Sequence, residues 1–300
     1  MSLKCALKID YFCNSMAKKK KSKSKALHRR RKKRRHARSK ILLMIFAALL
    51  LGTGYMLKEK ITLYVMTYLS PKEHKLLKNK PSEHERIERI TAHYADKTFG
   101  IDISHYQNPK DFEWDSLSIG HGTIPIDFII LRASMGTNGK DSNFKEFWSL
   151  AAKHKKLRGA YHFYRPDEDP IKQASQFLES VQLAEGDLAP VLDIEKAPRN
   201  ISKKKLKKNL QLFLDIVEER YKVKPILYTY YHYYNEYLAD DFSSYPVWLA
   251  NYNDVLEPHE SIPWSIWQFT ENGIVNGINT KVDLNIYNGS LWSMEQLTIP

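Results

Sequence analysis

Eight short apolar segments, each rich in β-branched and aromatic residues, follow one another between residues 99 and 287. Segments of this length and composition are typical of buried β-strands. The expected strands cover residues 99–104, 127–134, 157–164, 188–195, 224–231, 245–252, 265–270 and 282–287. Helical patterns separate the earlier strands, whereas the later gaps are shorter and poorer in helix. Alternating strands and helices imply a parallel α/β sheet, and eight strands favour a closed barrel with fewer helices in its second half.

The helices expected in the first half cover residues 142–155, 170–183 and 202–221. Asp169 stands directly before Pro170, which is the arrangement of an N-cap residue followed by proline at the first helical position. Ser202 holds the same capping position before the third helix. A further helix is expected near residues 83–93, in a charged and polar stretch that precedes the first strand.

The formal net charge of +13 is located in the amino-terminal tail. Residues 1–40 are rich in lysine and arginine and contain a single acid, Asp10, so the rest of the chain is slightly acidic overall. A nucleic-acid-binding domain has its basic patch on the folded part, so the charge distribution argues against nucleic acid as a partner. The basic run over residues 29–35 is better explained by membrane topology and contact with anionic lipid.

An uncharged apolar segment, residues 41–57, follows the basic tail. Its length is at the short end of what a membrane span requires. Because a basic segment precedes it, we expect a single-pass protein of the cell membrane whose tail, residues 1–40, is cytoplasmic. Residues 58–95 are then a juxtamembrane stalk, and everything after the anchor lies outside the cytoplasm. A cleaved signal peptide is the alternative, since Gly52 and Gly54 have the small-residue spacing of a cleavage site.

Both cysteines, Cys5 and Cys13, lie in the basic tail. The exported part therefore has no disulfide and depends on a sizeable hydrophobic core, which its length permits. Met16 begins a lysine-rich stretch and is an alternative to Met1 as the start of translation.

The segment Leu188–Glu195 has the pattern of a buried strand that ends in two carboxylates. Side chains alternate along a strand, so Asp193 and Glu195 face the same side, about 6.5–7 Å apart along the backbone. Cleavage of a glycosidic bond needs such a pair: a proton donor, and a partner that stabilises positive charge at the anomeric carbon. Burial and the neighbouring acid would raise the pKa of Glu195, so that it carries a proton near neutral pH. The alternative is that both acids are only solvated or salt-bridged.

Acidic and aromatic residues also recur near the ends of the other expected strands, where β/α barrels carry their catalytic residues. They include Asp102, Tyr161, Tyr228, Trp248, Trp267 and Asp283. Aromatic faces pack on sugar rings, and carboxylates and amides bond hydroxyl groups, so a sugar-binding cleft is expected. His105 and His162 do not have the spacing of a recognised metal site. No Gly-rich phosphate loop occurs, and the absence of a Gly-x-Ser-x-Gly elbow argues against a serine hydrolase. No metal and no cofactor are expected.

Several motifs along the chain together resemble glycoside hydrolase family 25. These are Gly100-Ile-Asp102-Ile-Ser104 with Gln107, Gly159-Ala-Tyr161-His162-Phe163, Pro190-Val-Leu-Asp193-Ile-Glu195, Trp248 with Ala250 and Tyr252, Trp267-Gln268, and Val282-Asp283-Leu-Asn285. The resemblance covers roughly residues 97–289, and its motifs stand in the family's order. The members that the chain resembles are lysozymes similar to the fungal Chalaropsis muramidase and to phage-encoded muramidases.

The resemblance implies a flattened, irregular β/α barrel over residues 96–289, followed by a tail over 290–300. It implies cleavage of the β-1,4 bond after N-acetylmuramic acid in peptidoglycan strands, without a cofactor. Glu195 matches the catalytic acid/base and Asp193 the acid that assists the other half of the reaction, while Asp102 and Asp283 match further acids of the cleft floor. The expected substrate-binding residues are Tyr161, Tyr228, Trp248, Trp267, Gln268 and Asn285.

Two roles are open for Asp193: direct attack on the anomeric carbon, or orientation of the substrate's 2-acetamido group so that its carbonyl oxygen attacks. Retention of configuration is expected from either. Two other functions also stay open. A hydrolase of chitin-like glycans would share the acid pair, although Val191 and Leu192 stand where chitinases have further acids. A membrane-tethered peptidoglycan-binding protein without activity would have no need for a proton donor such as Glu195.

Overall fold

The computed structural model describes residues 82–120 and 122–300. Its main feature is a nine-stranded sheet. The first strand of this sheet pairs with the last strand of the chain on one side and with β4 (Phe128–Met135) on the other, so that eight of the strands close into a barrel. The barrel strands are β1 (Thr98–Ile103), β4, β6 (Leu157–Phe163), β7 (Val191–Asp193), β8 (Ile226–Tyr230), β9 (Val247–Ala250), β10 (Trp264–Gly273) and β11 (Val282–Tyr287). All eight expected strands are thus present, and the expected barrel is confirmed.

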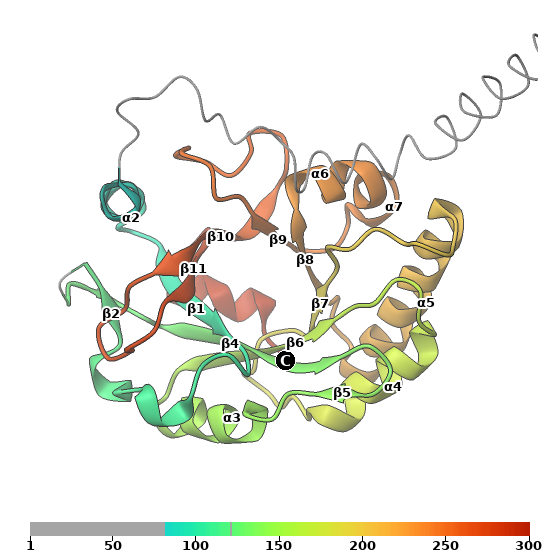
Figure 1. Cartoon of the computed structure of the whole chain (residues 1–300), viewed down its shortest axis with the longest axis horizontal. Coiled ribbons are helices and arrows are strands. Elements are labelled where there is room, and N and C mark those ends of the chain that lie inside the picture. The colour runs from blue at the N-terminus through green and yellow to red at the C-terminus, as the bar shows by residue number, and fades with distance from the viewer. Residues whose placement is uncertain (1–81, 121) are drawn as a thin grey trace, which may run out of the picture. The chain divides into compact units, whose positions relative to one another are not determined.

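Helices cover one half of the barrel (Figure 1). The longer helices of that half are α3 (Phe144–Lys153), α4 (Pro170–Ser180) and α5 (Lys203–Tyr221). The other half has α2 (Glu83–His93), which packs against β10, together with the short elements α6 (Tyr231–Tyr233), a π-helical turn (Tyr234–Leu238), α7 (Ala239–Phe242) and α8 (Leu291–Met294). Three 3₁₀ turns (Pro109–Asp111, Trp114–Ser116, Glu295–Leu297) and the short strands β2 (Ser118–Ile119), β3 (Ile124–Pro125) and β5 (Gly139–Lys140) complete the described elements.

The two expected helix starts are formed by the side chains that the sequence indicated. The Asp169 carboxylate accepts hydrogen bonds from the backbone N–H groups of Ile171 and Lys172, directly before Pro170 at the start of α4. The Ser202 hydroxyl accepts from the N–H of Lys205 at the start of α5. Each bond satisfies backbone donors that a helix leaves without a partner, which is why these starts depend on the local sequence.

The sheet is not parallel throughout, which corrects the expectation from the alternating pattern. Strands β1, β4, β6, β7, β8, β9 and β10 run parallel to their neighbours in the barrel, but β11 is antiparallel to both β1 and β10. Only residues 274–281 join β10 to β11. A parallel strand needs a crossover connection of about a dozen residues or more, so a loop of this length returns the chain antiparallel.

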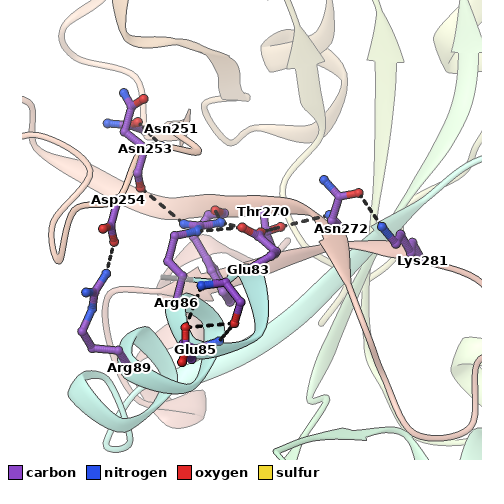
Figure 2. Close-up of polar contacts among 12 residues, drawn as sticks. Glu83, Glu85, Arg86, Arg89, Asn251, Asn253, Asp254, Thr270, Asn272 and Lys281 are labelled. Atoms are coloured by element: carbon purple, nitrogen blue, oxygen red, sulfur yellow. Dashed lines mark hydrogen bonds and ion pairs between the residues drawn. The ribbon is translucent and has the colours of Figure 1, made fainter. Parts of the chain in front are cut away.

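Two segments expected outside the barrel domain pack against it. Within the expected stalk, α2 buries Ile87, Ile90 and Arg86, and its polar contacts with β10 are shown in Figure 2. The expected tail over 290–300 contains a buried Met294, and the N–H of Ala189 donates to a carbonyl of this segment at 2.7 Å. Apolar side chains in both segments gain free energy by burial, so the compact domain extends beyond the boundaries drawn from the motifs.

The predicted anchor at residues 41–57 lies outside the described residues, as do the basic tail and the cysteines. Across residues 82–120 and 122–300, no helix is both long and apolar enough to cross a membrane.

Candidate active site

A cavity of about 460 Å³ lies where the parallel barrel strands end. All four expected acids line it: Asp102, Asp193, Glu195 and Asp283. Of the expected substrate-binding residues, Tyr161, Tyr228, Trp248 and Gln268 line it as well. The barrel therefore gathers side chains from β1, β6, β7, β8, β9, β10 and β11 into one polar and aromatic site.

Asp193 is the last residue of β7, and Glu195 follows it by two positions. The intervening Ile194 is fully buried, and its N–H donates to the carbonyl of Tyr228 at 3.0 Å, so extended pairing continues past the strand end. This alternation turns Asp193 and Glu195 toward the same cavity. The expectation that the two carboxyls share one side of the strand therefore agrees with the structure.

The two carboxyl groups hold protons more tightly than isolated ones do. Burial raises the pKa of Asp193 well above its usual range, and the charge of Glu195 raises it further. Burial also raises the pKa of Glu195, against a hydrogen bond from Tyr230 and the positive charge of Lys196. Because two like charges side by side in a poorly solvated cavity repel each other, the pair retains one proton above the pH at which free carboxyl groups lose theirs.

One oxygen of Asp193 has no protein partner. Its Oδ1 atom is buried and accepts no hydrogen bond from any residue within 82–120 and 122–300. Buried polar atoms are nearly always hydrogen-bonded, and exceptions concentrate at functional positions. Asp193 therefore presents a free acceptor to whatever enters the cavity.

Asp102 and Asp283 face each other across the antiparallel pair of β1 and β11. Two amides hold Asp102: Gln268 Nε2 and Asn285 Nδ2 each donate to its Oδ2 at 2.7 Å. Burial raises the pKa of Asp102, and these two hydrogen bonds act against the rise. Burial and the charge of Asp102 raise the pKa of Asp283 to about 9. Asp283 is thus protonated at neutral pH and donates a hydrogen bond to the carboxylate of Asp102.

The antiparallel direction of β11 is what brings Asp283 into the cavity. Asp283 is the second residue of that strand, and its register partner Asp102 is the fifth residue of β1. In a parallel strand, the second residue would lie near the opposite end of the barrel. Asp283 therefore lines the cavity because β11 runs antiparallel, which the expected parallel barrel did not include.

Two expected substrate-binding residues do not line the cavity. Trp267 is fully buried beside Tyr94 and Trp264, and its Nε1 donates to the carbonyl of Asn251 at 2.9 Å. It precedes Gln268 on β10, and alternation points neighbouring side chains to opposite faces. Asn285 is fully buried as well, and it contacts Asp102 rather than the cavity. Trp267 is therefore a core residue, and Asn285 fixes the Asp102 carboxylate by a hydrogen bond.

The hydroxyl groups of two tyrosines converge on Gln268. Tyr228 donates to its Oε1 at 2.7 Å, and the hydroxyl of Tyr252 donates to the same atom. The amide of Gln268 is thus held with its NH₂ group toward Asp102. Gln268 is 2% exposed, so its main contribution is to fix the carboxylate of Asp102.

Several residues that line the cavity were not among the predicted catalytic and substrate-binding residues. They are Ser104, His105, Tyr106, Arg132, Met135, Phe163, Lys196, Tyr230, Tyr252 and Glu271. Arg132 had a detectable signal, because it is the one charged residue in the apolar strand β4. Its Nη2 lies 3.0 Å from Oδ2 of Asp141, which keeps the guanidinium at the wall of the cavity. Tyr230 follows Tyr228 by two positions and faces the same side.

The acids of the cavity are not arranged as a metal site. Within residues 82–120 and 122–300, no group of three or more His, Cys, Asp or Glu side chains is placed to hold a metal ion. His162 is instead enclosed in the core: its Nδ1 lies 2.9 Å from the Ser134 hydroxyl, and its Nε2 lies 3.2 Å from Gln173. Burial lowers the pKa of His162 to about 4, so it is neutral at physiological pH.

The substitution Asp283→Asn is expected to raise thermal stability, and more so at high pH. The pKa of Asp283 is about 9 in the folded chain, against about 4 when unfolded, so the folded chain binds more protons between these values. Stability therefore falls as pH rises from about 4 to about 9. An asparagine removes this dependence and can still donate to Asp102. We expect the melting temperature of the variant to exceed that of the wild type by at least about 2 °C at pH 8, with the difference vanishing near pH 4.

Melting curves at pH 4, 6 and 8 check this expectation. Asp240→Asn serves as the control, because the Asp240 side chain is 87% exposed and its pairing with Lys207 is at the surface. An Asp283→Asn variant whose loss of stability grows from pH 4 to pH 8 would show that the carboxyl is held by a contact that requires its charge.

Comparison with known proteins agrees with the fold. The model of glycosyl hydrolases family 25 matches residues 101–278, more than half of the chain. A protein named YegX from Escherichia coli is 34% identical over 207 residues, which cover 69% of this chain and 75% of that protein. Lysozyme M1 of Streptomyces globisporus is 29% identical over 205 residues, covering 64% of this chain and 68% of that one.

Among solved structures, a family 25 glycosyl hydrolase from Bacillus anthracis superposes with a TM-score of 0.60 and 26% sequence identity. The superposition covers 68% of this chain and 94% of that one. The part matched by the family model contains the barrel strands from β4 to β10, the second half of β1, and the Asp193 and Glu195 pair. The chain therefore belongs to the glycosyl hydrolases of family 25 and is a glycoside hydrolase.

Proposed function

We propose that this protein is a membrane-tethered muramidase, which cleaves the β-1,4 bond between N-acetylmuramic acid and N-acetylglucosamine in peptidoglycan. The observation that carries the proposal is the pair of Asp193 and Glu195, which share one cavity with Asp102 and Asp283 at the strand ends of a family 25 barrel. The relatives named lysozyme support peptidoglycan as the substrate.

Glu195 is the proposed acid and base. Its pKa is raised by burial, so it can carry the proton that the leaving glycosidic oxygen needs. When the C1–O bond breaks, the proton of Glu195 passes to that oxygen. A water molecule then attacks C1 in the second half of the reaction and gives a proton back to Glu195. The acid is regenerated, and the configuration at C1 is retained.

Asp193 is the proposed partner of the substrate's 2-acetamido group. Its Oδ1 is buried without a protein donor, and an amide N–H is the kind of donor that would satisfy it. Such a bond favours the charged form of Asp193, so that the proton shared by the pair moves to Glu195. The acetamido carbonyl oxygen then attacks C1 as the bond to the leaving group breaks. Direct attack by Asp193 is the competing route, and trapping of a glycosyl ester on Asp193 would support it.

The placement in the cell is part of the proposal. The apolar segment 41–57 and the basic tail before it support a single membrane span with a cytoplasmic amino terminus. The catalytic barrel would then face peptidoglycan on the outer side of the membrane. Detection of the uncleaved chain in the membrane fraction supports the anchor, whereas a mature protein that begins after Gly54 supports a cleaved signal peptide.

The defining experiment is incubation of the purified full chain with peptidoglycan, followed by identification of the new reducing ends by mass spectrometry. We expect N-acetylmuramic acid at the new reducing ends. N-acetylglucosamine ends would assign the enzyme to the glucosaminidases, and cleavage of chitin oligomers alone would assign it to hydrolases of chitin-like glycans. Binding of peptidoglycan without any cleavage would favour a tethered binding protein and contradict the proposal.

A further inference from the structure

A buried arginine joins helix α2 to strand β10. Arg86 is only 4% exposed, although arginine is rarely buried unless its donors are paired. Its Nη2 donates to the carbonyl oxygen of Phe269 at 2.7 Å. Its Nη1 donates to the carbonyl oxygen of Asn253 at 3.3 Å (Figure 2). One guanidinium therefore holds two separate backbone segments, one within β10 and one in the loop that leads from β9 to β10.

The orientation of Arg86 is set by Glu83, one turn earlier on α2. Nε and Nη2 of Arg86 bond the two carboxylate oxygens of Glu83 at 3.0 and 2.7 Å, which is a two-point contact of fixed geometry. The hydroxyl of Thr270 donates to the same carboxylate. Glu83 thus keeps the arginine pointed at β10 and adds a second connection to that strand (Figure 2).

The carbonyl that Arg86 binds belongs to a bulge. Gln268 pairs with Ala250 of β9 and with Asn285 of β11, and the register with β11 then resumes only at Thr270. Phe269 has no register partner on either neighbouring strand. A bulge leaves a residue outside the ladder, and a buried carbonyl without a donor costs free energy. Arg86 supplies that donor, and so it stabilises the bulge from outside the sheet.

Both segments held by Arg86 lead directly into the cavity. Phe269 follows Gln268, which fixes Asp102, and Glu271 two positions later lines the cavity. Asn253 follows Tyr252, whose hydroxyl donates to Gln268. A change in either backbone segment therefore moves the group that holds Asp102.

We propose that Arg86 is a positioning residue: by clamping the β10 bulge and the start of the β9–β10 loop, it sets the place of Gln268 and Tyr252 against Asp102. Helix α2 lies outside residues 101–278 matched by the family model, whereas both carbonyls that Arg86 binds lie inside them. The inference rests on the proposed function only for its effect on turnover.

The test compares two arginines of α2 in the full chain. Arg86→Gln removes the charge and the contacts to both carbonyls. Arg89→Gln is the matched control, because Arg89 also joins α2 to the barrel, through Asp254, but its side chain is 43% exposed and it contacts nothing in the cavity. We expect kcat on soluble peptidoglycan fragments to fall about 10- to 100-fold in Arg86→Gln with little change in KM, and to stay unchanged in Arg89→Gln.

A loss of stability alone is separated from positioning by three further measurements. Turnover is measured well below the melting temperature of each variant. Arg86→Lys keeps the charge and a single donor nitrogen with three N–H groups, so it should recover part of kcat. It also carries the test if Arg86→Gln does not fold. Amide hydrogen exchange over residues 264–273 should accelerate in Arg86→Gln and not in Arg89→Gln.

The outcomes separate the proposals. Equal kcat in Arg86→Gln and wild type, with lowered melting temperature only, would overturn the positioning role and leave α2 as a stabilising helix. Unchanged hydrogen exchange in β10 would overturn the clamp itself. A wild-type chain that cleaves no peptidoglycan would count against the proposed function, whereas the exchange comparison would still decide whether Arg86 holds the bulge.

Discussion

Replacing Glu195 with glutamine is expected to lower kcat by about 10³-fold or more while the chain still folds, since general acid–base catalysis contributes 10²- to 10⁴-fold. The amide cannot give a proton to the leaving oxygen or take one from water. It can still accept the hydrogen bond that Tyr230 donates to Glu195, and it removes a carboxyl group whose pKa is raised by burial. We therefore expect a melting temperature equal to or above that of the wild type.

Turnover of peptidoglycan by the full chain, measured with thermal melts of the same preparation, checks this expectation. Glu219→Gln is the control, because it changes the same chemical group on α5, where the side chain of Glu219 is 81% exposed and paired with Lys222. A Glu195→Gln variant with near-normal turnover would show that another acid of the cavity donates the proton. In the wild type, activity should decline as pH rises through the raised pKa of Glu195, because the donor is then lost.

Replacing Asp193 with asparagine is expected to lower kcat by about 10²- to 10³-fold, the usual cost of removing one group that stabilises transition-state charge. The variant loses the carboxylate that would orient the acetamido group or attack C1. It also removes the like charge that helps to raise the proton affinity of the pair. The residual activity should therefore decline at a lower pH than that of the wild type, since Glu195 alone loses its proton more readily.

The pH profile of kcat for wild type and variant measures both effects. Asp187→Asn is the matched control. Asp187 directly precedes the segment Leu188–Glu195, is buried, and accepts a hydrogen bond from Nε of Arg158 at 2.7 Å. That variant should lose stability but keep kcat and the pH profile, because Asp187 does not line the cavity. An Asp193→Asn profile that coincides with the wild-type profile would mean that the two carboxyls titrate independently.

The structure changes how the site itself is understood. The resemblance assigned Gln268 and Asn285 to substrate binding, but both amides are used to hold the same oxygen of Asp102 at 2.7 Å. The four acids thus form two pairs with different surroundings. Asp102 is held by protein donors, whereas Asp193 keeps a buried oxygen without one among the residues that the structure describes. The second pair, Asp193 and Glu195, is therefore the better candidate for direct contact with the reacting atoms.

Much of the domain could be predicted from the sequence because the signals are local. Each of the eight strands is a short segment rich in apolar residues, and the starts of α4 and α5 depend on Asp169 and Ser202, which lie next to the donors they satisfy. The orientation of Asp193 and Glu195 toward one side follows from the two-residue period of a strand. None of these features requires knowledge of a distant part of the chain.

Other features depend on contacts between distant segments. The docking of α2 rests on Arg86 binding carbonyls 167 and 183 residues away, and a charged helix in front of a barrel carries no local sign of such partners. Trp267 and Gln268 are adjacent, and only the direction in which β10 faces the barrel decides that the tryptophan is core and the glutamine lines the cavity.

The sequence by itself determined the eight strands, the helix starts and the acid pair on one face of β7, because strand alternation and helix capping act over a few residues. Only the tertiary structure decided that β11 runs antiparallel, that Asp283 thereby reaches Asp102, and that the carboxyls share one cavity with raised pKa values. Closure of the barrel joins its first strand to its last, which lie at opposite ends of the domain sequence, and burial and mutual charge exist only once that closure has occurred.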